Sequence, residues 1–149
     1  MSNSSALSSR NFIIYLIGST VSLHGLWIYR VALGWFTWQL SGSEFWVGVV
    51  AFTQFAPAVI FGPLFGVLAD RVDRRKASIL INLGSTLNML LLGTLAALDL
   101  VNILVLCMLS LMQGCLDGAH TPVRMTLVPN LVNREQMQSA IASTSISFN

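Results

Sequence analysis

Long stretches almost free of charge dominate this 149-residue sequence and constrain its fold more than any other feature. Four stretches contain at most one charged residue each: residues 11–43, 45–69, 77–98 and 101–123. About 20 apolar residues cross a bilayer core as a helix, so each stretch is long enough to span a membrane. Spanning strands of a barrel are about half that length and alternate strictly between apolar and polar residues. The sequence therefore predicts an all-α, polytopic membrane helix bundle.

Composition supports the same fold class. Only 9% of the residues are charged, against about 25% in an ordinary soluble domain, and 54% are hydrophobic. A soluble enzyme could not cover its surface with so few charges. A cleaved signal peptide is also excluded as the explanation of the first stretch, because its apolar core would be only about 7–15 residues long.

Catalytic and cofactor motifs are absent from the sequence. It contains no metal-ligand spacing, no nucleophile paired with a base, and no glycine-rich loop with a phosphate-binding lysine. Cys107 and Cys115 lie eight residues apart in one apolar run, too far for a disulfide on one helix. We therefore expect no enzyme, no cofactor and no metal. We also expect no nucleic-acid partner, because topology accounts for nearly all the basic residues.

The basic residues predict the orientation in the membrane. Seven of them would lie on the side of the N-terminus: Arg10, Arg71, Arg74, Arg75, Lys76, Arg124 and Arg134. The opposite side would carry Glu44 and Asp99 and no basic residue. Because basic connections stay in the cytoplasm, we predict an integral protein of the plasma (inner) membrane with a cytoplasmic N-terminus.

We predict a disordered cytoplasmic tail over residues 1–10 and helices over about 11–40, 44–70, 76–98, 100–128 and 134–149. Ser43 and Asp99 are expected to cap the second and fourth helices at their N-termini. Asn133 and Gln136 form a predicted capping box at the start of a fifth helix. That helix reaches Asn149 too short to span, so a piece of a longer polytopic protein is expected. The alternative is a four-span protein with a short amphipathic tail.

The second helix carries small residues at a spacing of four. Ala58, Gly62 and Gly66 lie on one face, where such residues let a neighbouring helix approach closely. Asp70 continues the same face to the cytoplasmic end of the helix. We predict that this ridge packs against another helix and places a carboxylate at that contact.

A charged loop follows the ridge directly. The loop contains Asp70, Arg71, Asp73, Arg74 and Arg75. A positively charged anchor on the cytoplasmic side would explain the arginines, but it would not explain two aspartates at a fixed offset from Gly66. This pattern resembles the signature loop between helices two and three of the major facilitator superfamily. It departs from that pattern at Asp73, where glycine is commonest.

Two further stretches resemble the enterobactin-exporter and macrolide-efflux branch of that superfamily. The first runs from Gly25 through Arg30 to Trp35, and the second from Pro122 to Pro129. The resemblance implies twelve helices in two halves, of which this chain would be the first four and the start of the fifth. It further implies ion-coupled export of small amphipathic molecules of the drug or siderophore type, with protons as the coupling ion and the bilayer and remaining helices as partners.

The resemblance also implies an inner gate on the cytoplasmic side. In the family the loop arginine is thought to engage an acidic residue of helix four, which assigns Arg74 to Asp117 here. The loop aspartate, Asp70, would then face the other half of the transporter.

Two charges lie inside the predicted spans. Arg30 lies 19 residues from Asn11, about 29 Å along the first helix, whereas Asp117 lies in the inner half of the fourth helix. We therefore expect them to be poor partners. Arg30 has two interpretations: a cavity residue that attracts an anionic group or lies near a proton carrier, or a side chain that snorkels to the outer interface. His24 is expected to form a hydrogen bond within the bundle and to have no role in proton transfer.

Two other functions fit parts of the sequence. An autonomous four-span small multidrug exporter acting as a dimer would need a glutamate in its first helix, but Glu44 lies in the outer link. A non-transporting membrane assembly factor would have no requirement for Asp70 or Arg74.

Overall fold

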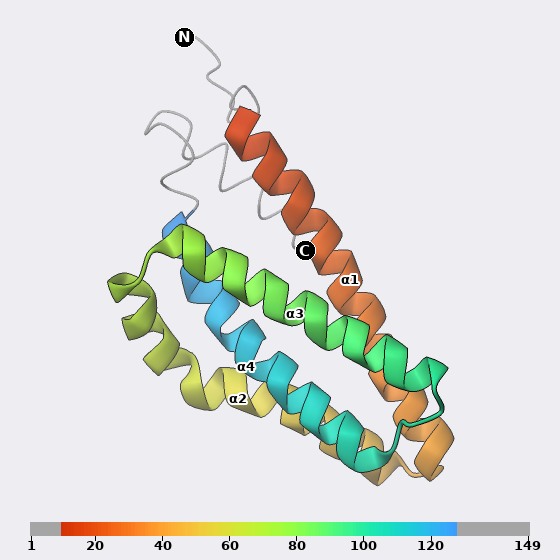
Figure 1. Ribbon diagram of the computed structural model, residues 1–149. Helices are drawn as coiled ribbons and strands as arrows, with labels where there is room; N and C mark the ends of the chain where they lie inside the picture. Colours follow the sequence, from red (N-terminus) through yellow and green to blue (C-terminus); the bar gives the residue numbers. More distant parts are fainter. Residues whose placement is uncertain (1–9, 128–149) are drawn as a thin grey trace, which may run out of the picture.

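The computed structural model describes residues 10–127 and contains four helices over that range. They are α1 (Arg10–Ser41), α2 (Glu44–Arg71), α3 (Arg74–Ala97) and α4 (Ile103–Leu127), and consecutive helices run antiparallel (Figure 1). Each is long and apolar enough to cross a membrane. The predicted all-α membrane bundle is therefore confirmed. Residues 1–9 of the predicted tail and the predicted fifth helix lie outside the described residues, whereas Arg10, which was assigned to the tail, begins α1.

Gly42 makes the sharp turn between α1 and α2. Its φ of 58° lies in the left-handed region, and its N–H bonds to the carbonyl of Trp38 at 2.8 Å. Glycine suits this position because it has no Cβ to clash there. Ser43 occupies the N-cap position of α2 but makes no side-chain capping bond. The hydroxyl of Ser41 instead accepts a bond from the Ser43 N–H at 3.2 Å.

Asn102, not Asp99, caps α4. The Asn102 side chain accepts a hydrogen bond from the Val105 N–H at 2.9 Å. Asp99 has a φ of 55° and belongs to the turn that ends α3, where the next residue, Leu100, bonds back to Leu95. A residue with left-handed backbone closes the preceding helix and lacks the extended geometry of an N-cap. The prediction that Asp99 caps the fourth helix was therefore wrong.

Asp73 organises the link between α2 and α3. Its carboxylate accepts hydrogen bonds from the N–H groups of Arg75 and Lys76 at 3.0 and 3.2 Å, which makes it the N-cap of α3. Its φ is −63°, so the link does not turn through a left-handed residue at this point. The side chain of Asp73 thus fixes the start of α3.

Helix α2 is bent along its second half (Figure 1). It contains Pro57 and Pro63, and each proline removes a backbone hydrogen bond and pushes its ring against the preceding turn. The bend separates the first part of α2, which lies along α4, from the part that leads to the charged loop (Figure 1).

Glycines of α4 allow that helix to lie directly against α2. A Cβ atom at Gly114 would overlap the carbonyl oxygen of Gln54, and one at Gly118 would come within 2.9 Å of the Ala58 Cα. The contact therefore uses a small-xxx-small pattern on α4, which the sequence analysis did not single out.

The predicted ridge on α2 meets α4 at Ala58 alone. A Cβ at Gly62 or Gly66 would have no atom of the described residues within 4 Å. The described residues therefore leave room for a side chain at both positions, and the part of these glycines in helix packing stays a prediction.

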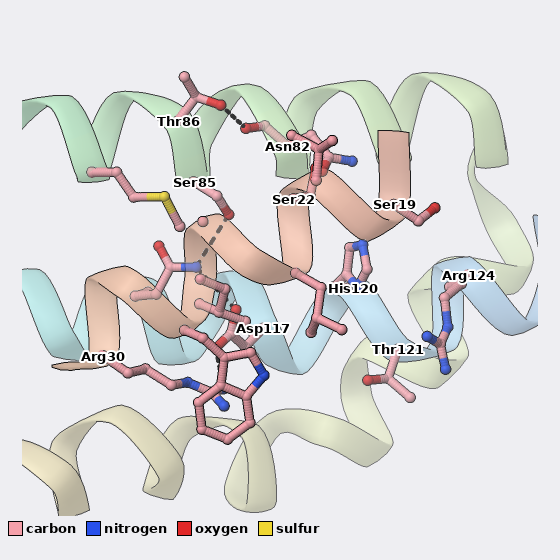
Figure 2. A pocket seen from close by; sticks show the side chains of 17 residues that line it. Ser19, Ser22, Arg30, Asn82, Ser85, Thr86, Asp117, His120, Thr121 and Arg124 are labelled. Carbon is pink, nitrogen blue, oxygen red and sulfur yellow. Dashed lines mark hydrogen bonds and ion pairs between the residues drawn. The ribbon is translucent and has the colours of Figure 1, made fainter. Parts of the chain in front are cut away.

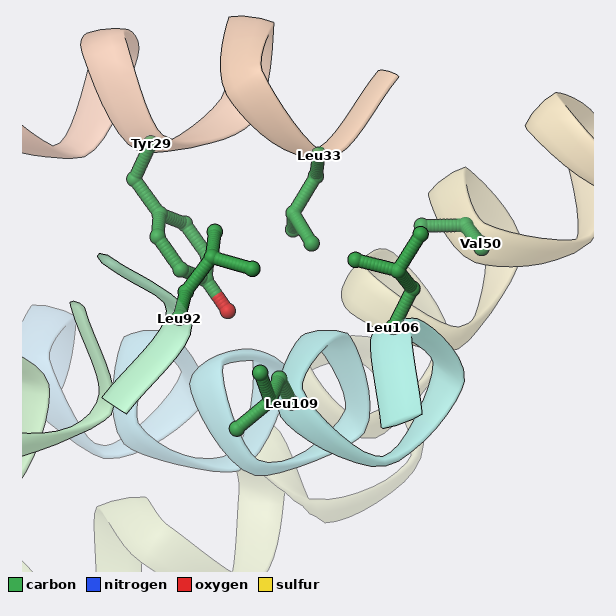
Figure 3. Close-up of a cluster of buried hydrophobic side chains, with 6 residues drawn as sticks. All are labelled: Tyr29, Leu33, Val50, Leu92, Leu106 and Leu109. Atoms are coloured by element: carbon green, nitrogen blue, oxygen red, sulfur yellow. The ribbon is translucent and has the colours of Figure 1, made fainter. Parts of the chain in front are cut away.

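The hydrophobic core lies at the end of the bundle where α1 connects to α2 and α3 connects to α4. All four helices contribute to it, and Figure 3 shows its buried members: Tyr29, Leu33, Val50, Leu92, Leu106 and Leu109. This is the end predicted to face outward. Apolar side chains fill the space between the helices there, while the opposite half of the bundle contains a cavity.

Candidate functional site

A cavity of about 570 Å³ lies between α1, α3 and α4, in the half of the bundle predicted to face the cytoplasm (Figure 2). Many of its lining residues are polar: Ser19, Ser22, Arg30, Asn82, Ser85, Thr86, Gln113, Asp117, His120, Thr121 and Arg124. Polar groups in membrane helices are costly against lipid, so they gather on inward faces. A smaller space of about 240 Å³ extends toward the start of α1 and shares Ser19, Ser22, Asn82 and His120 with it.

Helical spacing puts these polar side chains on one wall. On α4, Gln113, Asp117 and Arg124 follow at intervals of four and seven residues, a helical spacing that puts them on one face. On α3, Asn82, Ser85 and Thr86 repeat at the same helical spacing, a signal in the sequence that was not used.

An ion pair between Arg30 and Asp117 joins α1 to α4. The Arg30 Nη2 atom lies 3.1 Å from the Asp117 Oδ2 atom, and the two side chains are 22% and 20% exposed. Each charge therefore has its opposite within hydrogen-bond distance in a site largely removed from solvent. The expectation that these residues are poor partners was wrong.

Depth counted along α1 from Asn11 overstates the separation of Arg30 and Asp117, because α1 is longer than a membrane span. Helix α1 has 32 residues, about 48 Å, which exceeds the roughly 30 Å hydrocarbon core. Counted from the outer ends instead, Arg30 lies 11 residues before Ser41 and Asp117 lies 14 residues after Ile103. These counts correspond to about 16 Å and about 21 Å, a difference that the long arginine side chain can bridge.

Aromatic rings cover the guanidinium of Arg30. Its Cζ atom lies 5.2 Å from the ring centroid of Trp27 on α1 and 5.2 Å from that of Phe55 on α2. Cation–π attraction favours such contacts, most strongly where water is excluded. The Arg30 Nε atom, in contrast, is buried and has no hydrogen-bond partner.

Amide side chains extend the ion pair into a network. Gln113 Nε2 donates to Asp117 Oδ1 at 2.9 Å and to Ser85 Oγ at 3.2 Å. Asn88 Nδ2 donates to Gln113 Oε1 at 3.1 Å and to the hydroxyl of Tyr29 at 3.0 Å. The network therefore links α4 to α3 and back to α1, next to the hydrophobic core.

Asn88 was missed by the sequence analysis. It is fully buried, as is Gln113, and each is an amide within a membrane-spanning helix. Such a residue has to find partners inside the bundle, which is the signal that could have identified it.

The predicted gate residues lie at the opposite end of the cavity from Arg30. Arg71 ends α2, Asp73 caps α3, and Arg74 and Arg75 form the first turn of α3. Asp70 lies in the last turn of α2, but its side chain is outside the described part of the structure. Asp117, the predicted partner of Arg74, is bonded to Arg30 in this arrangement. The Arg74–Asp117 pair therefore stays a prediction.

The two histidines have different surroundings. His24 Nδ1 lies 2.8 Å from the carbonyl oxygen of Thr20 in its own helix and is exposed, whereas His120 lines the cavity. Within residues 10–127, no group of three or more His, Cys, Asp or Glu side chains could hold a metal ion.

Comparison with known proteins gives consistent matches along the chain. Residues 1–149 match a family described as transmembrane secretion effector. The staphyloferrin A transporter of Staphylococcus aureus is 23% identical over 142 residues, which are 95% of this chain and 34% of that protein. Macrolide efflux protein A of Streptococcus pyogenes is 31% identical over 124 residues, 80% of this chain and 30% of that protein.

A multidrug efflux pump of Mycolicibacterium fortuitum is 29% identical over 107 residues, 70% of this chain and 26% of the pump. The chain thus spans about a third or less of the length of these relatives. No solved structure matches the chain.

Proposed function

The chain belongs to the transmembrane secretion effector family of the major facilitator superfamily, and on this premise we propose that the intact protein is a secondary active exporter of small amphipathic molecules. The relatives named for a siderophore, a macrolide and several drugs support this class of cargo. The activity proposed is transport rather than catalysis.

The Arg30–Asp117 ion pair on the wall of the cavity is the observation that carries the proposal. Charges within a membrane bundle are costly, and they typically mark a substrate or ion pathway. A cavity of about 570 Å³ is in the range of small-molecule sites. Its combination of charge, hydroxyl and amide groups with apolar residues such as Leu26 and Met89 suits an amphipathic ligand.

Alternating access would move the ligand across the membrane. The outer half of the four helices is filled by the hydrophobic core, whereas the cavity occupies the inner half. We propose that this arrangement corresponds to the state that receives ligand from the cytoplasm, with the N-terminus on that side of the inner membrane. The seven-to-zero distribution of basic residues supports this orientation.

A proton gradient would drive the cycle. Asp117 is the carboxylate of the cavity wall, so it is the group proposed to exchange protons. The charged loop with Gly66, Asp70, Arg71, Asp73, Arg74 and Arg75 is proposed to close the inner side, with Asp70 facing the other half of the transporter. Asp73 would serve this gate by fixing the start of α3.

Efflux of a fluorescent amphipathic dye from cells tests the proposal. Cells that express the intact protein should lose dye faster than cells that express the Asp117→Asn variant at the same membrane level. A protonophore should abolish the difference, whereas ATP depletion with the proton gradient maintained should not. Equal efflux with and without Asp117, or efflux that follows ATP alone, would contradict the proposed function.

A further inference from the structure

Arg30 has more hydrogen-bond donors than its surroundings use. Arginine carries five N–H donors in a planar fork. Among the described residues, Asp117 Oδ2 is the one acceptor of a hydrogen bond from this fork, and Nη2 is the donor. The Nε atom is buried without a partner, a state that costs free energy wherever water is excluded.

Asp117 is held so that it accepts a hydrogen bond from only one nitrogen of the guanidinium, Nη2. Its Oδ2 atom faces Arg30 Nη2, while its Oδ1 atom accepts from Gln113 at 2.9 Å. A carboxylate with both oxygens on one guanidinium edge would form the stronger bidentate pair. The bond to Gln113 keeps Asp117 in a one-point contact.

Aromatic rings lie close to the Arg30 guanidinium without accepting conventional hydrogen bonds from it. Trp27 and Phe55 each lie 5.2 Å from the Arg30 Cζ atom. Arg30, Trp27 and Asp117 all line the cavity, so the partly used fork borders on the space proposed to receive ligand. Leu23, Leu26 and Met89 supply an apolar wall beside it.

We propose that Arg30 anchors the acidic group of an amphipathic ligand, and that Asp117 is the internal carboxylate with which this group competes. The ligand's carboxylate or related oxyanion binds the fork that Asp117 half satisfies, and its apolar part lies along the leucine and methionine wall. Asp117 thus holds Arg30 in place while the cavity is empty. This assignment rests on the proposed function and adds that the transported molecule carries a negative charge.

Competition makes opposite predictions for the two members of the pair. Removing the charge of Asp117 removes the competitor, so an anionic ligand should bind more tightly. Removing the charge of Arg30 removes the anchor, so the same ligand should bind more weakly. A site built for an organic cation would respond in the reverse order.

Calorimetric titration of the intact protein in nanodiscs of zwitterionic lipid tests this assignment. Three probes share one scaffold: 3-phenylpropionate as the anion, 3-phenylpropylammonium as the cation and 3-phenylpropionamide as the neutral compound. They are titrated into the parent protein, Asp117→Asn, Arg30→Gln and Arg30→Lys. Asp99→Asn is the matched control, since it removes a carboxylate from the outer link, away from the cavity.

The anion should bind best to the parent protein. Its affinity should rise about tenfold in Asp117→Asn and fall about tenfold in Arg30→Gln, as expected for one charged hydrogen bond. The affinity of Arg30→Lys for the anion should lie between that of Arg30→Gln and that of Asp117→Asn. The affinity of Asp99→Asn should equal that of the parent protein. The gain in Asp117→Asn does not depend on whether Arg30→Gln folds.

Preference for the cation, with loss of its binding in Asp117→Asn, would overturn the assignment while the proposed transport function stands. Equal binding of all three probes, unchanged by the substitutions, would also overturn it. Absence of binding by any probe, together with absence of dye efflux, would contradict both the assignment and the proposed function.

Discussion

At the scale of single residues, the polar side chains of this bundle act as partners rather than as independent charges. Asp117 is shared between Arg30 on α1 and Gln113 on its own helix, and Gln113 in turn connects to Ser85 and Asn88 on α3. Each group therefore depends on the next for its hydrogen bonds. Replacing one member leaves the others buried and unsatisfied.

Replacing Gln113 by leucine tests this dependence. Leucine fills a similar volume but removes the donors to Asp117 and Ser85 and the acceptor for Asn88. We expect the intact protein to lose about 1–3 kcal/mol of stability, seen as a lower thermal unfolding midpoint in detergent. Met112→Leu on the exposed side of the same helix is the control. An unchanged midpoint in Gln113→Leu would mean that the network contributes nothing to the fold.

At the scale of helices, the sequence predicted which segments span the membrane but not how they meet. Length and charge placement suffice for spans, because the bilayer imposes both. Contacts between helices depend on which face of each helix turns inward, and an apolar segment in lipid has no hydrophobic stripe to indicate it. The sequence therefore identified Gly62 and Gly66 as packing residues, whereas the close contact uses Gly114 and Gly118.

The candidate site was partly predictable for the same reason. The sequence identifies Arg30 and Asp117, because they are charged residues inside predicted spans. Their pairing could not be identified in this way, because it depends on how far α1 extends beyond the bilayer core and on the relative shift of two helices. The end caps behaved similarly: Ser43 occupies its predicted position, but Asn102 replaces Asp99.

Alanine substitutions at two glycines separate close packing from helix propensity. A Cβ at Gly114 would overlap the backbone of Gln54, so Gly114→Ala should cost about 1–3 kcal/mol by pushing α4 from α2. A Cβ at Gly93 on α3 would meet no described atom within 4 Å, so Gly93→Ala should cause no loss. The comparison uses thermal unfolding of the intact protein. Equal effects at both glycines would contradict the α2–α4 contact.

At the scale of the whole molecule, one end of the bundle is filled and the other contains the polar cavity. The core joins all four helices near the α1–α2 and α3–α4 links, and the cavity begins at the Arg30–Asp117 pair beside it. The charged loop lies at the far end of the cavity. The two ends of the bundle therefore differ in structure, and the functional proposal depends on which end faces the cytoplasm.

Cysteine labelling tests which end faces the cytoplasm. In a protein without Cys107 and Cys115, cysteines at Ser43 and Leu100 should react with an impermeant maleimide added to intact cells. A cysteine at Val72, which is exposed in the charged loop, should react only after the membrane is permeabilised. Labelling of Val72 in intact cells would reverse the predicted orientation and place the cavity on the outer side.

The central claim is that Arg30 and Asp117 act as a pair during transport. A double-mutant cycle in the intact protein measures this most directly, with efflux assayed in Arg30→Asp, Asp117→Arg and the combined swap at matched membrane levels. Each single change leaves two like charges facing each other in a partly buried site, so efflux should fall at least about tenfold. The swap should restore a substantial part of the lost efflux.

A parallel cycle with Arg74→Asp and Asp117→Arg tests the gate pairing. A swap at Arg30 that recovers nothing beyond the sum of the single changes, while the swap at Arg74 does recover efflux, would contradict the account.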